Sequence, residues 1–221
     1  MTAEEPSKRQ VGVLISGRGS NFQALLSATQ APDFPADIAV VISNRPNAGG
    51  LAIAEAAGLP NVTIDHRAYP SREAFEADIT AALSDHGVDL VAQAGFMRIN
   101  TASFIERWWN RLINIHPSLL PAFPGLDTHA RALAAGVKLH GCSVHFVREA
   151  VDQGPIIGQA AVPVLTGDDP DILAARVLQA EHRLYPHCLR LVAENRVTIE
   201  GESCIVEGPD RDEESFFNPR P

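Results

Sequence analysis

Short apolar runs, several of them rich in β-branched residues, alternate with helix-like segments through the first half of the chain. The apolar runs predict strands near residues 10–15, 37–43, 61–65, 88–95 and 111–116. Helices are predicted to begin near residue 20 and to span about 48–58, 71–84 and 101–108, the last with Asn100 as its N-cap. This alternation predicts a mostly parallel sheet with helices on both faces.

The pattern changes in the second half of the chain. The runs "HGCSVHFV" (140–147) and "IIGQAAVPV" (156–164), joined by "REAVDQGP", predict an antiparallel hairpin, so the sheet is expected to be mixed. A long helix is predicted from Asp169–Pro170 to about Glu194, because an Asp cap followed by proline is a helix start. Short strands are predicted at 196–200 and 203–206. The expected fold class is therefore α/β, with an antiparallel C-terminal hairpin on a mostly parallel sheet.

Composition narrows the classes of protein that fit. The 221 residues, 45% of them apolar, fit one domain with one core. The net charge of −9 disfavours nucleic acid as a partner, because binding phosphates needs clustered Lys and Arg. No apolar run reaches the roughly 20 residues of a membrane span. The three cysteines lack metal spacing and no signal peptide is visible, so we expect a cytoplasmic location.

The expected domain organisation follows from the polar ends of the chain. A single domain is predicted to cover residues 10–207. Residues 1–9 are predicted to form a flexible N-terminus, and residues 208–221 a tail.

A glycine-rich turn, "SGRGSN" (16–21), joins the first predicted strand to the first predicted helix. Gly17 and Gly19 would let backbone N–H groups approach a ligand closely, and Ser20 and Asn21 add donors at the positive end of the helix. This geometry suits a phosphate group. A plain tight turn before a capped helix is the alternative, because the pattern is neither GxGxxG nor a Walker loop.

The stretch "NIHPSLLPAFPG" (114–125) contains the strongest candidates for chemistry. In the predicted strand Asn114 and His116 share one face, and Pro117 ends the strand directly after them. Ligand sites of open α/β sheets gather at such strand ends. An Asn amide can donate to a developing oxyanion, and a His can move a proton near neutral pH. A hydrogen-bonded pair that merely finishes the strand is the alternative.

Three further features depend on what they meet in the fold. Asp152, in the turn between the hairpin strands, would favour a charged imidazolium if it lay beside His116, and is otherwise an ordinary turn former. Glu181 falls in line with an apolar helical stripe, where it would bind a ligand's hydroxyl groups or lie at the stripe's edge in solvent. The proline-rich segment 117–139 is either a mobile lid or a surface loop with a short helix.

Five motifs, in order and spacing, resemble the phosphoribosylglycinamide formyltransferases, folate-dependent enzymes of purine synthesis. The motifs are "SGRGSN", "AGFMRI", "NIHPSLLPAFPG…TH", "HGCSVHFV…VDQGPII" and "QAEHRLYP", and the likeness runs from about residue 10 to 200. The resemblance implies a Rossmann-like formyltransferase fold. It also implies transfer of the formyl group of 10-formyltetrahydrofolate, as co-substrate, to the amine of glycinamide ribonucleotide.

The resemblance also implies roles for individual residues. Asn114, His116 and Asp152 match the family's catalytic residues, Gly19, Ser20 and Asn21 its phosphate loop, and Glu181 its ribose ligand. The residues that match the family's folate site are Arg72, Met97, Arg98, Ile99, Asn100, Asn114, Arg148, Glu149, Ala150, Val151 and Asp152. Two positions depart from the family pattern: Asn100 stands where an apolar residue is familiar, and Asp127 where a His is familiar, while His129 is retained.

The implied mechanism is direct attack of the amine on the formyl carbon through a tetrahedral intermediate, with no metal. Small-molecule substrates are the expected partners, without nucleic acid or membrane, and a homodimer is left open. A 10-formyltetrahydrofolate hydrolase is the alternative activity, because such enzymes share the Asn–His–Asp residues but usually add an N-terminal regulatory domain. A methionyl-tRNA formyltransferase would need a C-terminal RNA-binding domain and a basic surface. A non-catalytic binding module would not need all three polar residues.

Overall fold

The computed structural model describes residues 8–207 and residue 218. The rest of the predicted N-terminal segment and tail lies outside the described residues, and the first strand already begins at Arg9. Contacts between Cα atoms divide the chain into two compact units, Met1–Ile113 and Asn114–Pro221. The main sheet has seven strands in the order β3-β2-β1-β4-β5-β6-β7.

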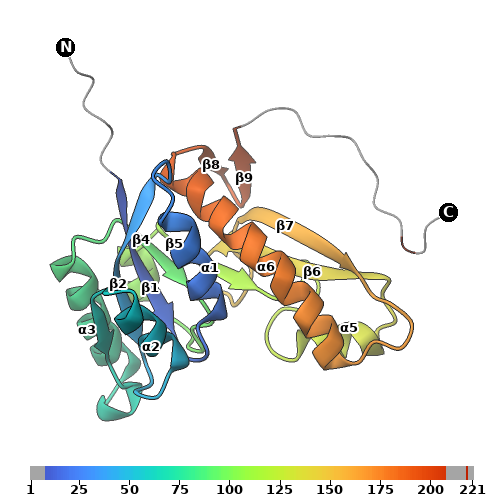
Figure 1. Ribbon diagram of the computed structural model, residues 1–221, viewed down its shortest axis with the longest axis horizontal. Coiled ribbons are helices and arrows are strands. Elements are labelled where there is room, and N and C mark those ends of the chain that lie inside the picture. Colours follow the sequence, from blue (N-terminus) through green and yellow to red (C-terminus); the bar gives the residue numbers. More distant parts are fainter. Residues whose placement is uncertain (1–7, 208–217, 219–221) are drawn as a thin grey trace. The chain divides into compact units, whose positions relative to one another are not determined.

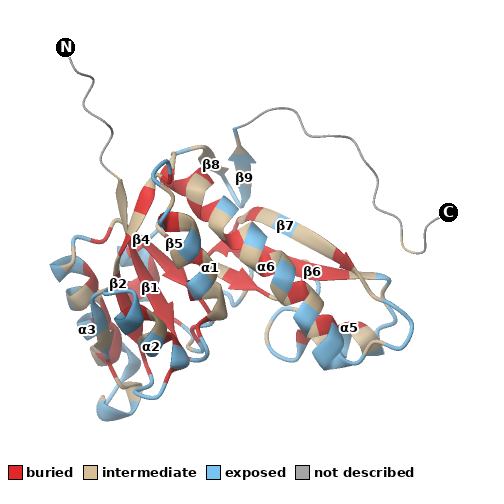
Figure 2. Ribbon diagram, in the orientation of Figure 1, coloured by how far each residue is buried: buried red, intermediate tan, exposed pale blue. Residues whose placement is uncertain are grey.

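The first unit alternates strands and helices, as the apolar pattern predicts (Figure 1). Its elements are β1 (Arg9–Ile15), α1 (Ser20–Thr29), β2 (Ala36–Ser43), α2 (Gly49–Ala56), β3 (Asn61–Thr63), the 3₁₀ turn η1 (His66–Ala68), α3 (Arg72–Asp85), β4 (Leu90–Gln93) and α4 (Ala102–Arg107). β1 pairs in parallel with both β2 and β4, and β2 pairs in parallel with β3. Parallel strands with helices on their faces are buried on both sides, and Figure 2 shows β1 as largely buried.

Capping side chains mark the starts of α3 and α4. The Ser71 hydroxyl accepts a hydrogen bond from the Ala74 N–H at the start of α3. The prediction that Asn100 caps α4 is wrong by one position, because Thr101 Oγ1 accepts from the Phe104 N–H instead. The Asn100 side chain is used inside the unit, as described below.

The second unit is built around the predicted hairpin. β5 (Leu112–His116) crosses from the first unit to the second, and is followed by α5 (Thr128–Ala134), β6 (Leu139–Phe146), β7 (Ile156–Pro163), α6 (Pro170–Ala193), β8 (Val197–Glu200) and β9 (Ser203–Val206). β6 and β7 pair antiparallel, and their register shifts between Val144 and His145. β8 and β9 form a separate two-stranded sheet. The mixed α/β sheet expected from the sequence is therefore confirmed.

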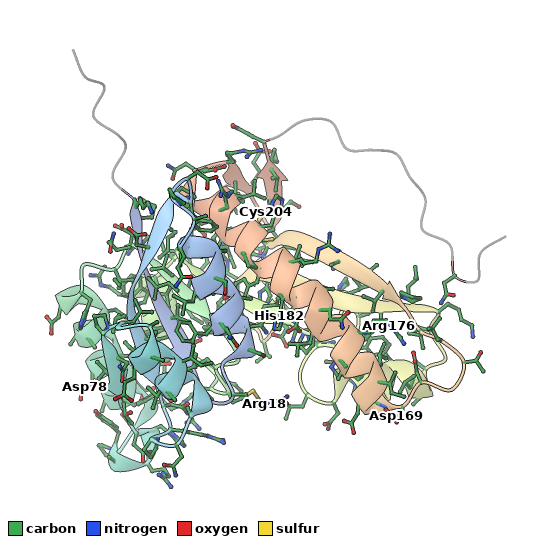
Figure 3. The ribbon with its side chains drawn as sticks, viewed as in Figure 1. Arg18, Asp78, Asp169, Arg176, His182 and Cys204 are labelled. Atoms are coloured by element: carbon green, nitrogen blue, oxygen red, sulfur yellow. The ribbon has the colours of Figure 1, made fainter. Side chains whose placement is uncertain are left out.

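The long helix α6 lies along β6 and β7 (Figure 1). Asp169, at the start of α6 in Figure 3, accepts a hydrogen bond from the Ile172 N–H, and Pro170 follows it as the first helical residue. Leu173 and Val177 from α6 share a buried cluster with Cys142 of β6 and Val162 of β7. This cluster fixes the helix over the hairpin that carries part of the candidate site.

Candidate active site

The polar pair of β5 lies where the strand ends. His116 is the last residue of the strand and Pro117 follows it, so no ladder hydrogen bond can continue the pairing from that nitrogen. His116 is only 6% exposed. Its Nε2 donates to the carbonyl oxygen of Phe123 at 3.0 Å, and its Nδ1 lies 3.3 Å from Asp152 Oδ2.

These two contacts favour one protonation state of the ring. A carbonyl oxygen can only accept, so His116 Nε2 carries a proton. An unprotonated Nδ1 would point its lone pair at a carboxylate oxygen, whereas a protonated Nδ1 forms an ion pair with it. Each ring nitrogen of His116 therefore faces an oxygen acceptor. The structure brings Asp152 and His116 side by side, which is the arrangement that the expected charged acid requires.

Asp152 is held in place by backbone. It occupies the third position of a turn in which the Gln153 N–H donates to the Ala150 carbonyl oxygen, and its φ is 56°. Asp tolerates this left-handed conformation better than most side chains do. Its Oδ2 accepts a hydrogen bond of 2.8 Å from the Gly125 N–H. The backbone of residues 123–125 thus contacts both members of the His116–Asp152 pair.

His145, a residue not expected at the site from the sequence, completes the cluster. Asn114 does not bond His116 directly; its Nδ2 donates to His145 Nε2 at 3.3 Å. The same Nε2 lies 3.7 Å from Asp152 Oδ1. The four side chains of Asn114, His116, His145 and Asp152 are called the β5–β6 cluster below. The register shift between Val144 and His145 interrupts the alternation along β6, so no residue pattern shows that His145 faces this cluster.

The segment 117–139 is anchored at several points. Ser143 Oγ donates to the Ser118 carbonyl oxygen and accepts from the Leu120 N–H, while Gln159 Nε2 donates to the Leu120 carbonyl oxygen. The segment also contains α5. This arrangement agrees with the alternative of a loop plus a short helix more closely than with a free lid.

A second pair of histidines joins this segment to β6. His140 Nε2 and His129 Nδ1 are 3.2 Å apart, so one imidazole donates to the other. Burial lowers the pKa of His129, and burial together with the neighbouring histidines lowers the pKa of His140 to about 4. Asp127, the departure from the family pattern, precedes α5 with a φ of 56° and makes no side-chain cap.

In the first unit, the glycine-rich turn takes the conformation that its glycines allow. Gly19 has a φ of 80°, and a Cβ added there would lie 2.6 Å from the Gly50 Cα. Only glycine therefore permits the turn to approach the start of α2 so closely. Gly19 is the N-cap of α1 and supplies no side-chain cap, so Ser20 and Asn21 begin the helix. This is the geometry expected for binding an anion at a helix start.

The predicted folate segment begins at Met97, whose N–H donates to Ser16 Oγ at 2.8 Å. Ser16 Oγ also donates to Asn44 Oδ1 at 2.6 Å, so one hydroxyl joins the ends of β1 and β2 to this segment. Met97 and Ile99 are 57% and 58% exposed. Exposed apolar side chains of this size are typical of a ligand surface. Arg72, at the start of α3, places Nη1 3.5 Å from the Ile99 carbonyl oxygen.

Asn100, which ends this segment, belongs to a buried polar network. Its Oδ1 accepts from Gln93 Nε2 at 2.6 Å, and its Nδ2 donates to Glu76 Oε1 at 3.2 Å. Glu76 also accepts from the N–H and the hydroxyl of Thr101. The network binds the start of α4 to α3, and the departure of Asn100 from the family pattern thus has a structural role.

Two other predicted site residues are placed by the second unit. Glu181 is 6% exposed, so it lies inside the apolar stripe of α6 and not at a solvent-exposed edge. Arg148 is half-buried, and burial lowers its pKa. The negative charge of Glu202, between β8 and β9, acts to raise that pKa but does not cancel the effect of burial. The predicted contact of Arg148 with folate stays a prediction.

Residues 8–207 and 218 include no group of three or more His, Cys, Asp or Glu side chains that could hold a metal ion. No described helix is both long and apolar enough to cross a membrane.

Comparison with known proteins places this geometry in one family. The family model described as formyl transferase matches residues 9–189. The phosphoribosylglycinamide formyltransferase of Escherichia coli is 42% identical over 89% of this chain and 92% of its own length. A trifunctional purine biosynthetic protein of Bos taurus is 47% identical over 91% of this chain, which spans only 20% of that relative.

Solved structures agree with the sequence comparison. The glycinamide ribonucleotide transformylase of Symbiobacterium toebii superimposes with a TM-score of 0.88 and 50% identity, covering 90% of this chain and 94% of its own. A formyltetrahydrofolate deformylase of Pseudomonas syringae is more distant, at 28% identity and a TM-score of 0.84, with 90% of this chain and 66% of its own covered. On the family model and these relatives together, the chain belongs to the formyl transferase family.

Proposed function

We propose that the chain transfers the formyl group of 10-formyltetrahydrofolate to the amine of glycinamide ribonucleotide, a step of purine synthesis. The observation that carries the proposal is the β5–β6 cluster, in which an ion-paired imidazole and a carboxamide lie at one strand end. Family membership and the similarity to the Escherichia coli enzyme support the choice of substrates. The formyl donor is a co-substrate, and the proposed chemistry involves no metal.

The binding roles are divided between groups of residues. Gly19, Ser20 and Asn21 bind the ribonucleotide phosphate through the start of α1, and Glu181 binds the ribose. The folate-binding residues are Arg72, the segment 97–100, Asn114 and the segment 148–152. The exposed Met97 and Ile99 supply apolar contact area for the folate rings.

The reaction proceeds by addition and elimination. The neutral amine attacks the formyl carbon, a new C–N bond forms, and the carbonyl electron pair moves onto oxygen. The protonated His116 and the Asn114 amide donate hydrogen bonds to that oxygen. Water held by Asp152 takes the proton that the attacking nitrogen loses. The electron pair on oxygen then re-forms the carbonyl as the bond from the formyl carbon to folate N10 breaks. N10 accepts a proton from that water directly, or from His116, which the released proton then recharges. Tetrahydrofolate and the formylated ribonucleotide result.

Each contribution has a typical magnitude. General acid–base catalysis supplies about 10²–10⁴ in rate. A preorganised oxyanion donor supplies about 10²–10³. Asp152 acts through His116, because its carboxylate holds the ring charged and oriented. These contributions are large enough that loss of one residue is measurable in a simple assay.

The test compares His116→Ala and Asp152→Asn with wild type in an absorbance assay for folate product. We expect each variant to lose most of its activity while both ligands still bind. His86→Gln is the matched control, because His86 lies at the end of α3 and contacts only a backbone carbonyl oxygen of that helix, that of Ala82, in its described hydrogen bonding. Near wild-type turnover in either cluster variant would contradict the mechanism.

Two further measurements separate the alternatives. Folate product formed without glycinamide ribonucleotide would favour the hydrolase, and tight folate binding without turnover would favour a binding module. A double Ser20→Ala, Asn21→Ala variant should chiefly raise the ribonucleotide KM, because it removes the side chains of the phosphate turn. An unchanged KM would remove the phosphate assignment without touching the catalytic one.

A further inference from the structure

We propose that His145 is a positioning residue that fixes which end of the Asn114 carboxamide faces the reacting carbonyl. The inference rests on the proposed function, in which Asn114 donates to the oxyanion. Nothing in the family resemblance assigned a role to this histidine. It follows from the hydrogen bonds of the ring and from its position in β6.

The ring of His145 has a defined proton arrangement. The side chain is 2% exposed, and its Nδ1 lies 2.9 Å from the carbonyl oxygen of Phe146. Because a carbonyl oxygen only accepts, Nδ1 carries a proton. In the neutral ring Nε2 is then an acceptor with its lone pair in the ring plane. The register shift between Val144 and His145 lies at this point of the hairpin, where irregular pairing re-aims a side chain.

The surroundings of His145 favour the neutral ring. Burial is the largest cause that lowers its pKa, and the charges of His116 and Arg148 act in the same direction. The Phe146 carbonyl and the Asp152 carboxylate act in the opposite direction, but the net pKa is lowered. An Nε2 acceptor is therefore maintained near neutral pH.

This acceptor determines the orientation of Asn114. An Asn side chain offers two donors at one end and an acceptor oxygen at the other. Only the NH₂ end can bond to an unprotonated Nε2, and that contact is present at 3.3 Å. One amide hydrogen is thus used on His145, and the other remains for the substrate oxygen. Without His145 the amide can turn over and present its oxygen, which repels an oxyanion.

Asp152 is the alternative partner of His145. Its Oδ1 lies 3.7 Å from Nε2, longer than a hydrogen bond. A doubly protonated His145 would donate a hydrogen bond to Asp152, and its Nε2 proton would face the hydrogens of the Asn114 amide. The two arrangements therefore predict different effects of substitution. In one, His145 acts through Asn114; in the other, it acts through Asp152.

The test is a double-mutant cycle. His145→Leu removes the acceptor at similar volume, and we expect kcat to fall roughly 10- to 100-fold, no more than for Asn114→Ala. In the Asn114→Ala background, His145→Leu should change kcat by less than roughly twofold, because coupled residues are not additive. His145→Gln, whose oxygen can accept from Asn114, should recover part of the loss. Ribonucleotide KM should stay near wild type throughout.

Several results would overturn the inference. Equal losses from His145→Leu in both backgrounds would show that His145 does not act through Asn114. So would a His145→Gln variant no better than His145→Leu. If His145→Leu does not fold, nitrogen NMR of the wild-type ring decides: we expect a proton on Nδ1 only, and a protonated Nε2 near neutral pH refutes the inference. Full activity of Asn114→Ala alone would instead refute the proposed function.

Discussion

Replacing Asn100 by Ala tests whether the buried network supports the fold of the first unit. Asn100 is 9% exposed, and its two partners, Gln93 and Glu76, are each 4% exposed. The substitution removes one hydrogen bond from each partner. Glu76 keeps the two donors of Thr101, and each of the two lost hydrogen bonds contributes about 1–2 kcal/mol.

The sum is a free energy of unfolding lowered by about 2–4 kcal/mol. For a chain of this length the Tm should fall by roughly 4–16 °C. Thermal and urea melts followed by circular dichroism measure both quantities. Asn61→Ala is the matched control, because Asn61 is exposed and donates only to the nearby Leu59 carbonyl oxygen among its described hydrogen bonds. A Tm of Asn100→Ala within about 2 °C of that control would refute the reasoning.

A second substitution at the same position checks the cause. Asn100→Asp keeps an acceptor for Gln93 but places a carboxylate where an amide now donates to Glu76. One of the two carboxyls must then hold a proton, so its folded-state pKa is raised above its unfolded value. Such a group contributes stability below the unfolded pKa that is lost as the pH rises. The Tm deficit of Asn100→Asp should therefore be smaller near pH 4 than near pH 7.

Three further predictions concern other parts of the chain. Gly154→Ala should lower the free energy of unfolding by about 1–3 kcal/mol or more and reduce activity, because the new Cβ would lie 1.7 Å from the Phe146 carbonyl oxygen; a normal melt with full kcat would contradict this. Arg18 is exposed at the glycine-rich turn, as Figure 3 shows. Because Arg18→Ala removes a positive charge, it should raise the ribonucleotide KM roughly two- to fivefold at low salt and less at high salt. A change in KM that does not depend on salt would exclude the charge contribution. Arg176 lowers the pKa of Asp168 to about 2. The stability that this ion pair contributes is therefore present above the unfolded-state pKa of the carboxyl and is lost as the pH falls toward about 2. Asp168→Asn should lower the Tm near pH 7 but not in strong acid, and an equal Tm deficit at the two pH values would refute the pairing.

Much of the fold could be predicted from the apolar pattern because the central strands of the first unit, β1 and β4, are largely buried. Their buried residues form short apolar runs, and α3, which precedes β4, begins at the cap residue Ser71. The hairpin was predicted from two such runs with a turn-forming segment between them. The predicted N-cap of α4 is misplaced by one residue, because both Asn100 and Thr101 are good caps and the sequence does not show that Gln93 and Glu76 hold the Asn100 side chain.

Part of the candidate site could also be predicted from the pattern along a strand. Alternation along a strand puts Asn114 and His116 on one face, and the structure places Asp152 beside His116. His145 and the Phe123 carbonyl could not be found this way. Their positions depend on the hairpin register and on backbone angles in an irregular segment, which no residue pattern encodes.

The Phe123 carbonyl bears directly on how the site would work. It accepts the same His116 N–H that the formyl oxygen would need, so ligand binding and this hydrogen bond exclude one another. A hydrogen bond to a charged group is worth about 1.5–3 kcal/mol. Phe123 also has a φ of 52°, an unusual conformation for a bulky residue that costs about 1–3 kcal/mol. If Phe123 leaves this conformation when its carbonyl is displaced, relief of the backbone strain offsets a similar amount of the lost hydrogen bond. On that condition the carbonyl holds the His116 ring in place before the substrate arrives and is displaced by it at little net cost.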